Sequence, residues 1–196
     1  MNLIVPIVEG HGELEAFPVL LRRLATWIAP NKYIDIAPPI RTGRDKFLNN
    51  SNEFSKMLKL AQLKARTDGR VMLLLDADDD CPYLLTTRIL AMANQSVPHL
   101  NLSVVIANRE YEAWFIAASN SINRTREFTL TQQIPVDPDA PRDAKGWLGR
   151  QMNSGYNPIL DQPAFSARFD LNEAWANSRS FRRLCDEFIR LSENAL

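Results

Sequence analysis

Acidic residues follow three apolar stretches of this sequence and could together bind a divalent cation. They are Glu9 and Glu13 after residues 3–8, Asp76 and Asp78 after residues 70–75, and Glu110 and Glu112 after residues 101–108. Carboxylates that face one another repel, which raises their pKa values unless a cation neutralises them. Oxygen ligands without histidine or thiolate partners favour magnesium or manganese over zinc. The pattern therefore predicts a site for Mg²⁺ or Mn²⁺.

Each acidic pair also has an ordinary explanation when it is taken alone. Glu13 in the first turn of a helix would interact favourably with the helix dipole. The run "DADDD" at residues 76–80 could be a solvated turn that caps the next helix. Glu112 could be a ligand, or a group that orients one. The metal prediction therefore depends on the three pairs meeting in space.

The residues between Glu9 and Glu13 favour close approach of a ligand. Gly10 and Gly12 would let the backbone come near a phosphate or a metal-bound water. His11 could move a proton or touch a phosphate, or it could be an exposed loop histidine. A further set of basic residues could contact a nucleic-acid backbone or lie on a solvated loop. That set is Arg41, Arg44 and Lys46.

The elements that must position these residues alternate between strand and helix. Short apolar runs predict four strands, at residues 3–8, 32–37, 70–76 and 101–108. Continuous apolarity is typical of strands covered on both faces, as in a parallel sheet, although Pro6 would favour an edge position for the first strand. The alternation predicts an open, mainly parallel four-stranded α/β sheet flanked by helices. Functional groups in such sheets gather beyond the carboxyl ends of the strands.

The helices are expected between and after the strands. We expect Pro18 to start or interrupt the first helix, and Ser51 to cap a helix over residues 51–65. Trp114 and Phe115 are predicted to be core residues. The α/β domain is expected to cover residues 1–124. Residues 125–196 are expected to form a Pro/Asp-rich loop and a helical extension packed on the same domain.

Composition excludes several classes of protein. The 196 residues contain 23 Lys and Arg and 23 Asp and Glu, for a formal net charge of zero, which argues against a polycation that coats DNA by charge alone. Two cysteines and two histidines without motif spacing imply no disulfide framework and no Cys/His zinc site. The N-terminal segment has no basic n-region and its apolar run is short, so we expect a soluble, cytoplasmic protein.

The ordered motifs resemble a known fold and a known family. A glutamate after the first strand and an Asp-x-Asp after a later one, here Glu9 and Asp76-Ala77-Asp78, resemble the topoisomerase–primase (Toprim) fold. "EGHGE" resembles the Toprim nucleases of the overcoming-lysogenization-defect family, which would imply phage defence. The stretches "VEGHGELEAFPVLLRRL", "LLLDADDD", "NREYEAWF", "KGWL" and "SRSFRRL" together resemble the DUF4276 family over nearly the whole chain.

The resemblance implies roles for individual residues. Glu9 would act as general acid/base or metal ligand, Glu13 would match an additional glutamate used with two metals, and Lys145 would be the downstream lysine. His11 joins Glu9 and Lys145 as a candidate catalytic residue. The resemblance implies Glu9, Glu13, Asp76 and Asp78 as metal ligands, and Asp80 and Glu112 are further candidates from the acidic pattern itself. Proteins of the DUF4276 type are also proposed to act beside an ATPase partner.

Two functions from different classes follow from these observations. The first is a metal-dependent nuclease that acts on DNA or RNA under the control of a partner. The second is a non-catalytic regulatory or interaction module that keeps the fold and binds metal or nucleotide without turnover. An aspartyl phosphatase would carry its Asp-x-Asp after the first strand, where this chain has glutamate. The chain contains no Gly-x-x-x-x-Gly-Lys-Ser/Thr loop for ATP hydrolysis.

Overall fold

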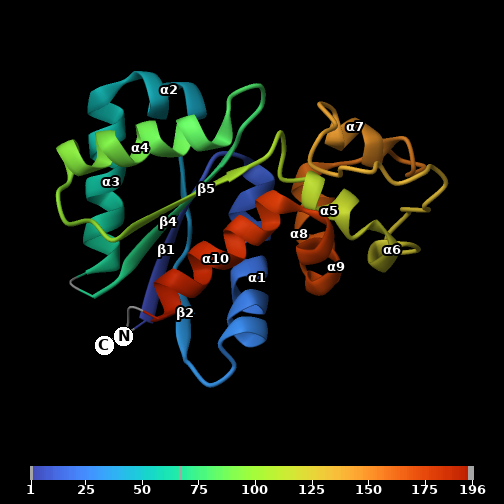
Figure 1. Ribbon diagram of the computed structural model, residues 1–196, viewed down its shortest axis with the longest axis horizontal. Coiled ribbons are helices and arrows are strands. Elements are labelled where there is room, and N and C mark those ends of the chain that lie inside the picture. Colours follow the sequence, from blue (N-terminus) through green and yellow to red (C-terminus); the bar gives the residue numbers. More distant parts are fainter. Residues whose placement is uncertain (1, 67, 194–196) are drawn as a thin grey trace.

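The computed structural model describes residues 2–66 and 68–193, and contains a parallel sheet covered by helices on both faces (Figure 1). The strands are β1 (Asn2–Val8), β2 (Ile34–Ile36), β3 (Ile40–Arg41), β4 (Arg70–Asp76) and β5 (Leu102–Ala107). Their order is β2-β1-β4-β5. Strand β2 pairs with the first part of β1, and β3 pairs with its last two residues. The prediction of a mainly parallel α/β sheet is confirmed. The number of strands is corrected from four to five, because β3 is too short to show an apolar pattern.

The helices precede, connect and follow the strands. They are α1 (His11–Ile28), α2 (Arg44–Asn49), α3 (Ser51–Ala65), α4 (Pro82–Ser96), α5 (Ala113–Ala117), α6 (Ser119–Ile122), α7 (Ala144–Gly149), α8 (Pro158–Ser166), α9 (Leu171–Asn177) and α10 (Arg179–Glu193). Figure 1 shows α1 and α10 on one face of the sheet and α2, α3 and α4 on the other. Helices α5 to α9 lie together beside α1, to the right in that view.

Alternate residues of the strands fill two separate cores. Val5 and Ile7 of β1 pack toward α3 and α4, whereas Ile4 and Val8 pack toward α1 and α10. The central strand β4 divides its side chains in the same way. Because successive side chains of a strand point to opposite faces, a strand with helices on both sides must be apolar throughout. This is why the strands read as unbroken apolar runs.

Pro6 lies in the middle of the sheet and not at its edge, contrary to the expectation from its missing N–H. The carbonyls of Ile4 and Val8 accept hydrogen bonds from Ala37 and Thr42 on the β2 and β3 side. Alternate residues of a strand direct their backbone groups to the same side, so the backbone nitrogen of Pro6 points to the side of β2 and β3, into the gap between them. The absent donor therefore falls where no strand is paired.

Several predicted helix boundaries are corrected. Helix α1 runs without a break from His11 to Ile28 and contains Pro18 in its interior, because burial of Phe17, Leu20 and their neighbours against the sheet outweighs the lost backbone bond. The cap of α3 is Asn50 and not Ser51, since the Asn50 side chain accepts from Asn52 N and Glu53 N. Trp114 and Phe115 are fully buried, as predicted.

The C-terminal region packs back on the sheet domain. Helix α8, which the sequence analysis did not predict, packs against α1, and α10 packs against β5. The predicted terminal helix is confirmed as far as Glu193, while residues 194–196 lie outside the described residues. None of the described helices has the length and apolar character needed to cross a membrane.

Candidate functional site

The acidic strand ends meet at the carboxyl edge of the sheet. Strands β1, β4 and β5 are parallel neighbours, and Asp76 at the end of β4 pairs in register with Ala107 at the end of β5. A cleft of about 420 Å³ lies beyond this edge. Its lining is Glu9, Gly10, His11, Gly12, Glu13, Asp76, Glu112, Lys145, Asn157, Pro158, Ile159 and Gln162. The structure thus brings one or more acids from each of the three strand ends into one place.

Glu13 folds back onto the turn that precedes its own helix. Its Oε2 atom accepts hydrogen bonds from Glu9 N at 2.9 Å and Gly10 N at 3.0 Å. The side chain is buried, and burial raises its pKa to about 7, against the opposing effect of these two bonds and with a smaller contribution from Glu112. A carboxylate with this pKa is only partly ionised at neutral pH. Glu13 therefore stabilises the turn and also adds charge to the cleft.

Asp76 links the end of β4 to the turn after β5. Its Oδ1 accepts from the backbone N–H of Tyr111 at 2.8 Å, and its Oδ2 lies 3.7 Å from the ammonium of Lys145. Burial raises the pKa of Asp76 well above its usual value, and the neighbouring charge of Glu13 adds to the increase. Asp76 would therefore gain from a nearby cation.

Glu112 is completely buried at the base of the cleft. Its Oε1 accepts from the Tyr156 hydroxyl at 3.1 Å and from Gln162 Nε2 at 3.4 Å. Its Oε2 lies 3.0 Å from Lys145 Nζ. Burial raises the pKa of Glu112, while Lys145 opposes the increase. The sequence predicts Glu112 to be a ligand or a group that orients one, and this geometry is compatible with either role.

Lys145 is the cation that this cleft contains. Its Nζ lies 3.7 Å from Asp76, 3.5 Å from Glu110 and 3.0 Å from Glu112. Burial alone would lower the pKa of Lys145, but the carboxylates, with Glu112 first, outweigh burial and raise it. Lys145 is therefore a firmly protonated ammonium. Helix α7 holds it there through the Asp143 cap, and the Lys145 N–H donates to Glu110 at 3.0 Å.

Glu9 has an oxygen that nothing in the described part of the chain satisfies. Glu9 Oε2 is buried and has no hydrogen-bond partner among the described residues. Burial raises the pKa of Glu9, and the charge of Asp78 adds to this effect. A buried, unpaired carboxylate oxygen is energetically costly. Glu9 is thus the carboxylate in this cleft with the most to gain from a proton donor or a cation.

Asp78 and Asp80 lie outside the cleft, on the exposed loop between β4 and α4. Arg44 Nη2 contacts Asp80 Oδ2 at 2.5 Å, and Arg44 Nη1 lies 3.7 Å from Asp78 Oδ2. A neighbouring hollow of about 450 Å³ is lined by Glu9, Arg41, Gly43, Arg44, Asp45, Lys46 and Asp78. The structure therefore gathers the predicted basic residues beside Glu9, and it pairs one of them with the aspartates that the sequence analysis assigned to metal.

The donor atoms of the cleft suit a hard cation, although they are not gathered around one point. Among the described residues, no three side chains of the types His, Cys, Asp and Glu are positioned to hold a metal ion together. The oxygen-only donor set and the unpartnered Glu9 Oε2 fit Mg²⁺ or Mn²⁺. Binding would require the carboxylates to turn toward the ion.

Tertiary contacts add residues that the sequence analysis did not select. Tyr156 and Gln162 come from the segment around α8 and contact Glu112. Their approach depends on Gly12, because a Cβ atom there would lie 2.2 Å from Gln162 Oε1 and 2.5 Å from the Pro158 carbonyl. The signal in the sequence was the second glycine of "EGHGE", which marks a close approach without naming its partner.

Comparison with known proteins places the chain in one family. A search of curated proteins and a search of solved structures found no match. The family model described as "Domain of unknown function (DUF4276)" matches residues 8–189. That match spans most of the chain; it begins at the last residue of β1 and includes every residue that lines the cleft and most of α10. The chain belongs to the DUF4276 family.

Proposed function

We propose that this protein is a Mg²⁺- or Mn²⁺-dependent phosphodiesterase, a nuclease of Toprim type that acts on DNA or RNA. One observation carries the proposal. Four carboxylates from three strand ends line a cleft with a single ammonium, and one buried oxygen, Glu9 Oε2, has no partner in the described residues. Such an excess of buried negative charge is stable only with added protons or cations. A structural core would not need this arrangement.

The proposal assigns each residue a task. Glu13, Asp76 and Glu112 would hold the cations, with Asp78 joining from the loop, and Glu9 would serve as the base. The bound ions would polarise the phosphoryl group and lower the pKa of a water molecule. Water would attack the phosphorus as the P–O bond to the leaving oxygen breaks, and the leaving oxygen would take a proton from solvent. Glu9 Oε2 would accept the proton of the attacking water, since the raised pKa of Glu9 makes it a better base than an exposed carboxylate. His11, which is exposed at the mouth of the cleft, would carry that proton to solvent.

Lys145 would provide positive charge to the phosphate. Its ammonium faces the cleft from α7 and is held by three carboxylates. A fixed ammonium can stabilise negative charge that develops on a phosphoryl oxygen. When a cation neutralises Asp76 and Glu112, the ammonium of Lys145 would become free to contact the substrate.

The Toprim relationship and the partner are part of the same proposal. The support for the fold is a glutamate after β1 and an Asp-x-Asp after β4 at one edge of a parallel sheet. The support for partner control is the zero net charge, which predicts weak binding to nucleic acid by the chain alone. An ATPase partner is proposed only on the family resemblance.

A non-catalytic module is the second candidate, and one observation favours it. Lys145 already contacts three carboxylates, so the chain itself supplies part of the neutralising charge. In such a module the cleft would bind a cation or a nucleotide without turnover. The two candidates differ in whether a bond is broken.

Manganese binding and plasmid nicking test the proposal. Calorimetry with Mn²⁺ would compare the wild type with Asp76→Asn, which retains an oxygen to accept the Tyr111 N–H, and with Asp186→Asn on the exposed side of α10 as a control. We expect Asp76→Asn to lose Mn²⁺ binding and nicking, and Glu9→Gln to lose nicking by about 100-fold or more. Binding without nicking would favour the module. Absence of Mn²⁺ binding by the wild type would contradict both candidates as metal proteins.

A further inference from the structure

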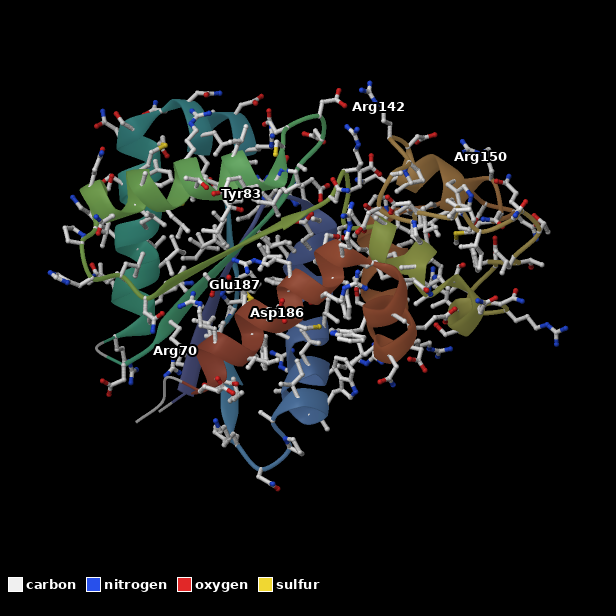
Figure 2. The ribbon with its side chains drawn as sticks, viewed as in Figure 1. Arg70, Tyr83, Arg142, Arg150, Asp186 and Glu187 are labelled. Carbon is white, nitrogen blue, oxygen red and sulfur yellow. The ribbon has the colours of Figure 1, made fainter. Side chains whose placement is uncertain are left out.

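Three arginines surround the loop between β4 and α4, which carries Asp78, Asp79 and Asp80 and lies beside the cleft. Arg44 precedes it from α2, Arg109 follows β5, and Arg142 lies in the segment before α7. Arg109 Nη1 contacts Asp79 Oδ1 at 2.5 Å, and Arg142 Nη2 lies 3.2 Å from the same oxygen. Figure 2 shows Arg142 at the outer end of its segment, near the tip of the loop between β4 and α4. With the Arg44–Asp80 pair, each guanidinium of this set has an aspartate partner.

The aspartates cover two of the arginines from the solvent side. The side chains of Asp79 and Asp80 are 70% and 57% exposed, whereas those of Arg44 and Arg109 are 16% and 27% exposed. Arg44 Nε is buried and has no hydrogen-bond partner among the described residues. An exposed ion pair contributes little to stability. The loop therefore has little reason in stability alone to place three consecutive aspartates against these arginines.

The backbone holds this arrangement in place. Asp78 and Arg109 both have positive φ angles, of 50° and 65°, a conformation that costs energy for residues other than glycine. The Asp78 N–H donates to the Arg109 carbonyl at 3.0 Å, and Arg109 Nη1 donates to the Asp78 carbonyl at 2.8 Å. The loop after β4 and the loop after β5 thus bind each other in a fixed register. This register keeps Asp79 against the guanidinium groups of Arg109 and Arg142.

We propose that Arg44, Arg109 and Arg142 form a binding rim for the phosphates of a nucleic-acid strand, and that Asp79 and Asp80 occupy this rim in the free protein. Guanidinium groups bind carboxylate and phosphate in the same bidentate manner, so one can replace the other. The arginines come from three separate segments and border two hollows, of about 450 and 180 Å³. A row of sites along an edge suits a polymer with repeated phosphates better than a single small anion.

The three arginines of the rim lie where a nucleic-acid strand would enter the cleft. Glu9 lines both the cleft and the hollow that contains Arg44. A strand held by the three arginines would therefore pass the carboxylate to which the proposed function assigns the proton transfer. This inference rests on that function for its substrate, but the binding step requires neither metal nor catalysis.

The experiment measures binding of a short labelled single-stranded oligonucleotide by fluorescence anisotropy in EDTA, so that cleavage plays no part. Asp79→Asn/Asp80→Asn removes the competing carboxylates. Asp68→Asn/Asp186→Asn removes two exposed carboxylates elsewhere and gives the same net charge. We expect the loop variant to bind about 10-fold more tightly than this control at low salt. Its plot of log affinity against log salt should be steeper by about 2, since about three phosphate contacts are freed.

Arginine substitutions complete the test. In the background of the loop variant, Arg109→Gln/Arg142→Gln should return the affinity to about the wild-type value. If Arg109→Gln lowers the melting temperature, the exposed Arg142→Gln alone should still remove part of the gain. Equal affinity of the loop variant and the charge-matched control would overturn the proposal. So would full retention of the gain without the arginines, or displacement of the oligonucleotide by inorganic phosphate at equal phosphate concentration.

The outcome is separable from that of the proposed function. Tighter binding by the loop variant with no nicking by the wild type in Mn²⁺ would support the phosphate rim and contradict the nuclease. Nicking by the wild type without any gain in the loop variant would support the nuclease and contradict the rim.

Discussion

Carboxylates are buried in two different settings in this protein, and they differ in how their oxygens are satisfied. Asp139, Asp161 and Glu187 form the first setting, in the helical region and under α10. Asp139 accepts from Ser178 Oγ at 2.7 Å and from the N–H and Oγ of Ser180, both at 3.0 Å. These bonds attach the loop of residues 125–143 to the start of α10. Burial of a carboxylate here serves structure.

Asp161 and Glu187, the other two buried carboxylates of the first setting, also have partners for both oxygens. Asp161 accepts from Arg126 Nε at 2.5 Å and from Asn157 N at 2.8 Å. Glu187, labelled on α10 in Figure 2, accepts from Ser103 at 2.6 Å and pairs with two arginines, Arg183 and Arg190. Each buried carboxylate therefore has donors for both oxygens, which is the usual condition of a polar group inside a protein.

The cleft is different because its carboxylates outnumber the cations that line it. Glu9, Glu13, Asp76 and Glu112 share one ammonium, and burial raises the pKa of each. Burial of charge is thus not itself a sign of function in this molecule. The shortage of positive charge, together with the unpartnered Glu9 Oε2, is the informative property. Variants that remove a carboxylate should therefore have opposite effects in the two settings.

The largest expected effect on stability is at Asp139. Asp139→Ala would leave the buried hydroxyl and N–H groups of Ser178 and Ser180 without their acceptor. Loss of three bonds at about 1 to 1.5 kcal/mol each should lower the free energy of unfolding by about 4 kcal/mol. Urea unfolding followed by tryptophan fluorescence measures it. The control is Asp186→Ala on the exposed side of α10, which should change stability by less than about 0.5 kcal/mol. Equal effects would remove the distinction between structural and surface carboxylates.

Glu13→Gln should have the opposite sign, and its effect should depend on pH. The pKa of Glu13 rises from 4.5 in the unfolded chain to about 7 in the folded protein, so the folded state binds the proton more tightly. Stability is therefore lost as pH rises from about 4.5 to about 7, and changes no further above that. Glutamine does not ionise, and its oxygen can accept the two backbone bonds of Glu13.

The expected gain for Glu13→Gln at about pH 8 is on the order of 3 kcal/mol, and near zero at about pH 4. Urea unfolding at both pH values in EDTA provides the measurement. Added Mn²⁺ should reduce the difference at the higher pH, because a cation would stabilise ionised Glu13 in the wild type. A gain of equal size at the two pH values would show that ionisation of Glu13 is not the cause.

Gly12→Ala tests the element that the two settings share. Helix α8 carries Asp161 of the first setting and Gln162 of the cleft, and the added Cβ would lie 2.2 Å from Gln162 Oε1. Displacing α8 should cost about 2 kcal/mol, although alanine favours helix more than glycine does. Gly10→Ala is the matched control, because its nearest neighbour would be Glu13 Oε1 at 3.4 Å. Equal thermal stability of the two variants would argue against close packing of α8.

Glu9→Gln should have the smallest effect on stability. It removes the charge of the unpartnered oxygen, but Glu9 is only half-buried, so solvent screens the gain to less than about 1 kcal/mol. Thermal unfolding at about pH 8 in EDTA would measure a small increase. A decrease would mean that Glu9 has a stabilising partner in solution, and would weaken the comparison on which the site rests.

The sequence by itself determined the α/β class and where the acids lie along the strands. Unbroken apolar runs indicated β1, β4 and β5, because these strands are covered on both faces. Glu9, Glu13, Asp76 and Glu112 could be placed at one edge because parallel strands end together. Lys145 was selected through the family resemblance, and the structure places it in the same cleft.

Only the tertiary structure decided which acids share the cleft and what covers it. Asp76 and Asp78 are two residues apart, yet one faces Lys145 in the cleft while the other lies on an exposed loop beside Arg44. Tyr156 and Gln162 reach Glu112 from more than 40 residues along the chain. Local periodicity reports which face of an element is buried. It carries no information about which distant side chain supplies a partner, because that depends on how α8 and the loops pack against the sheet.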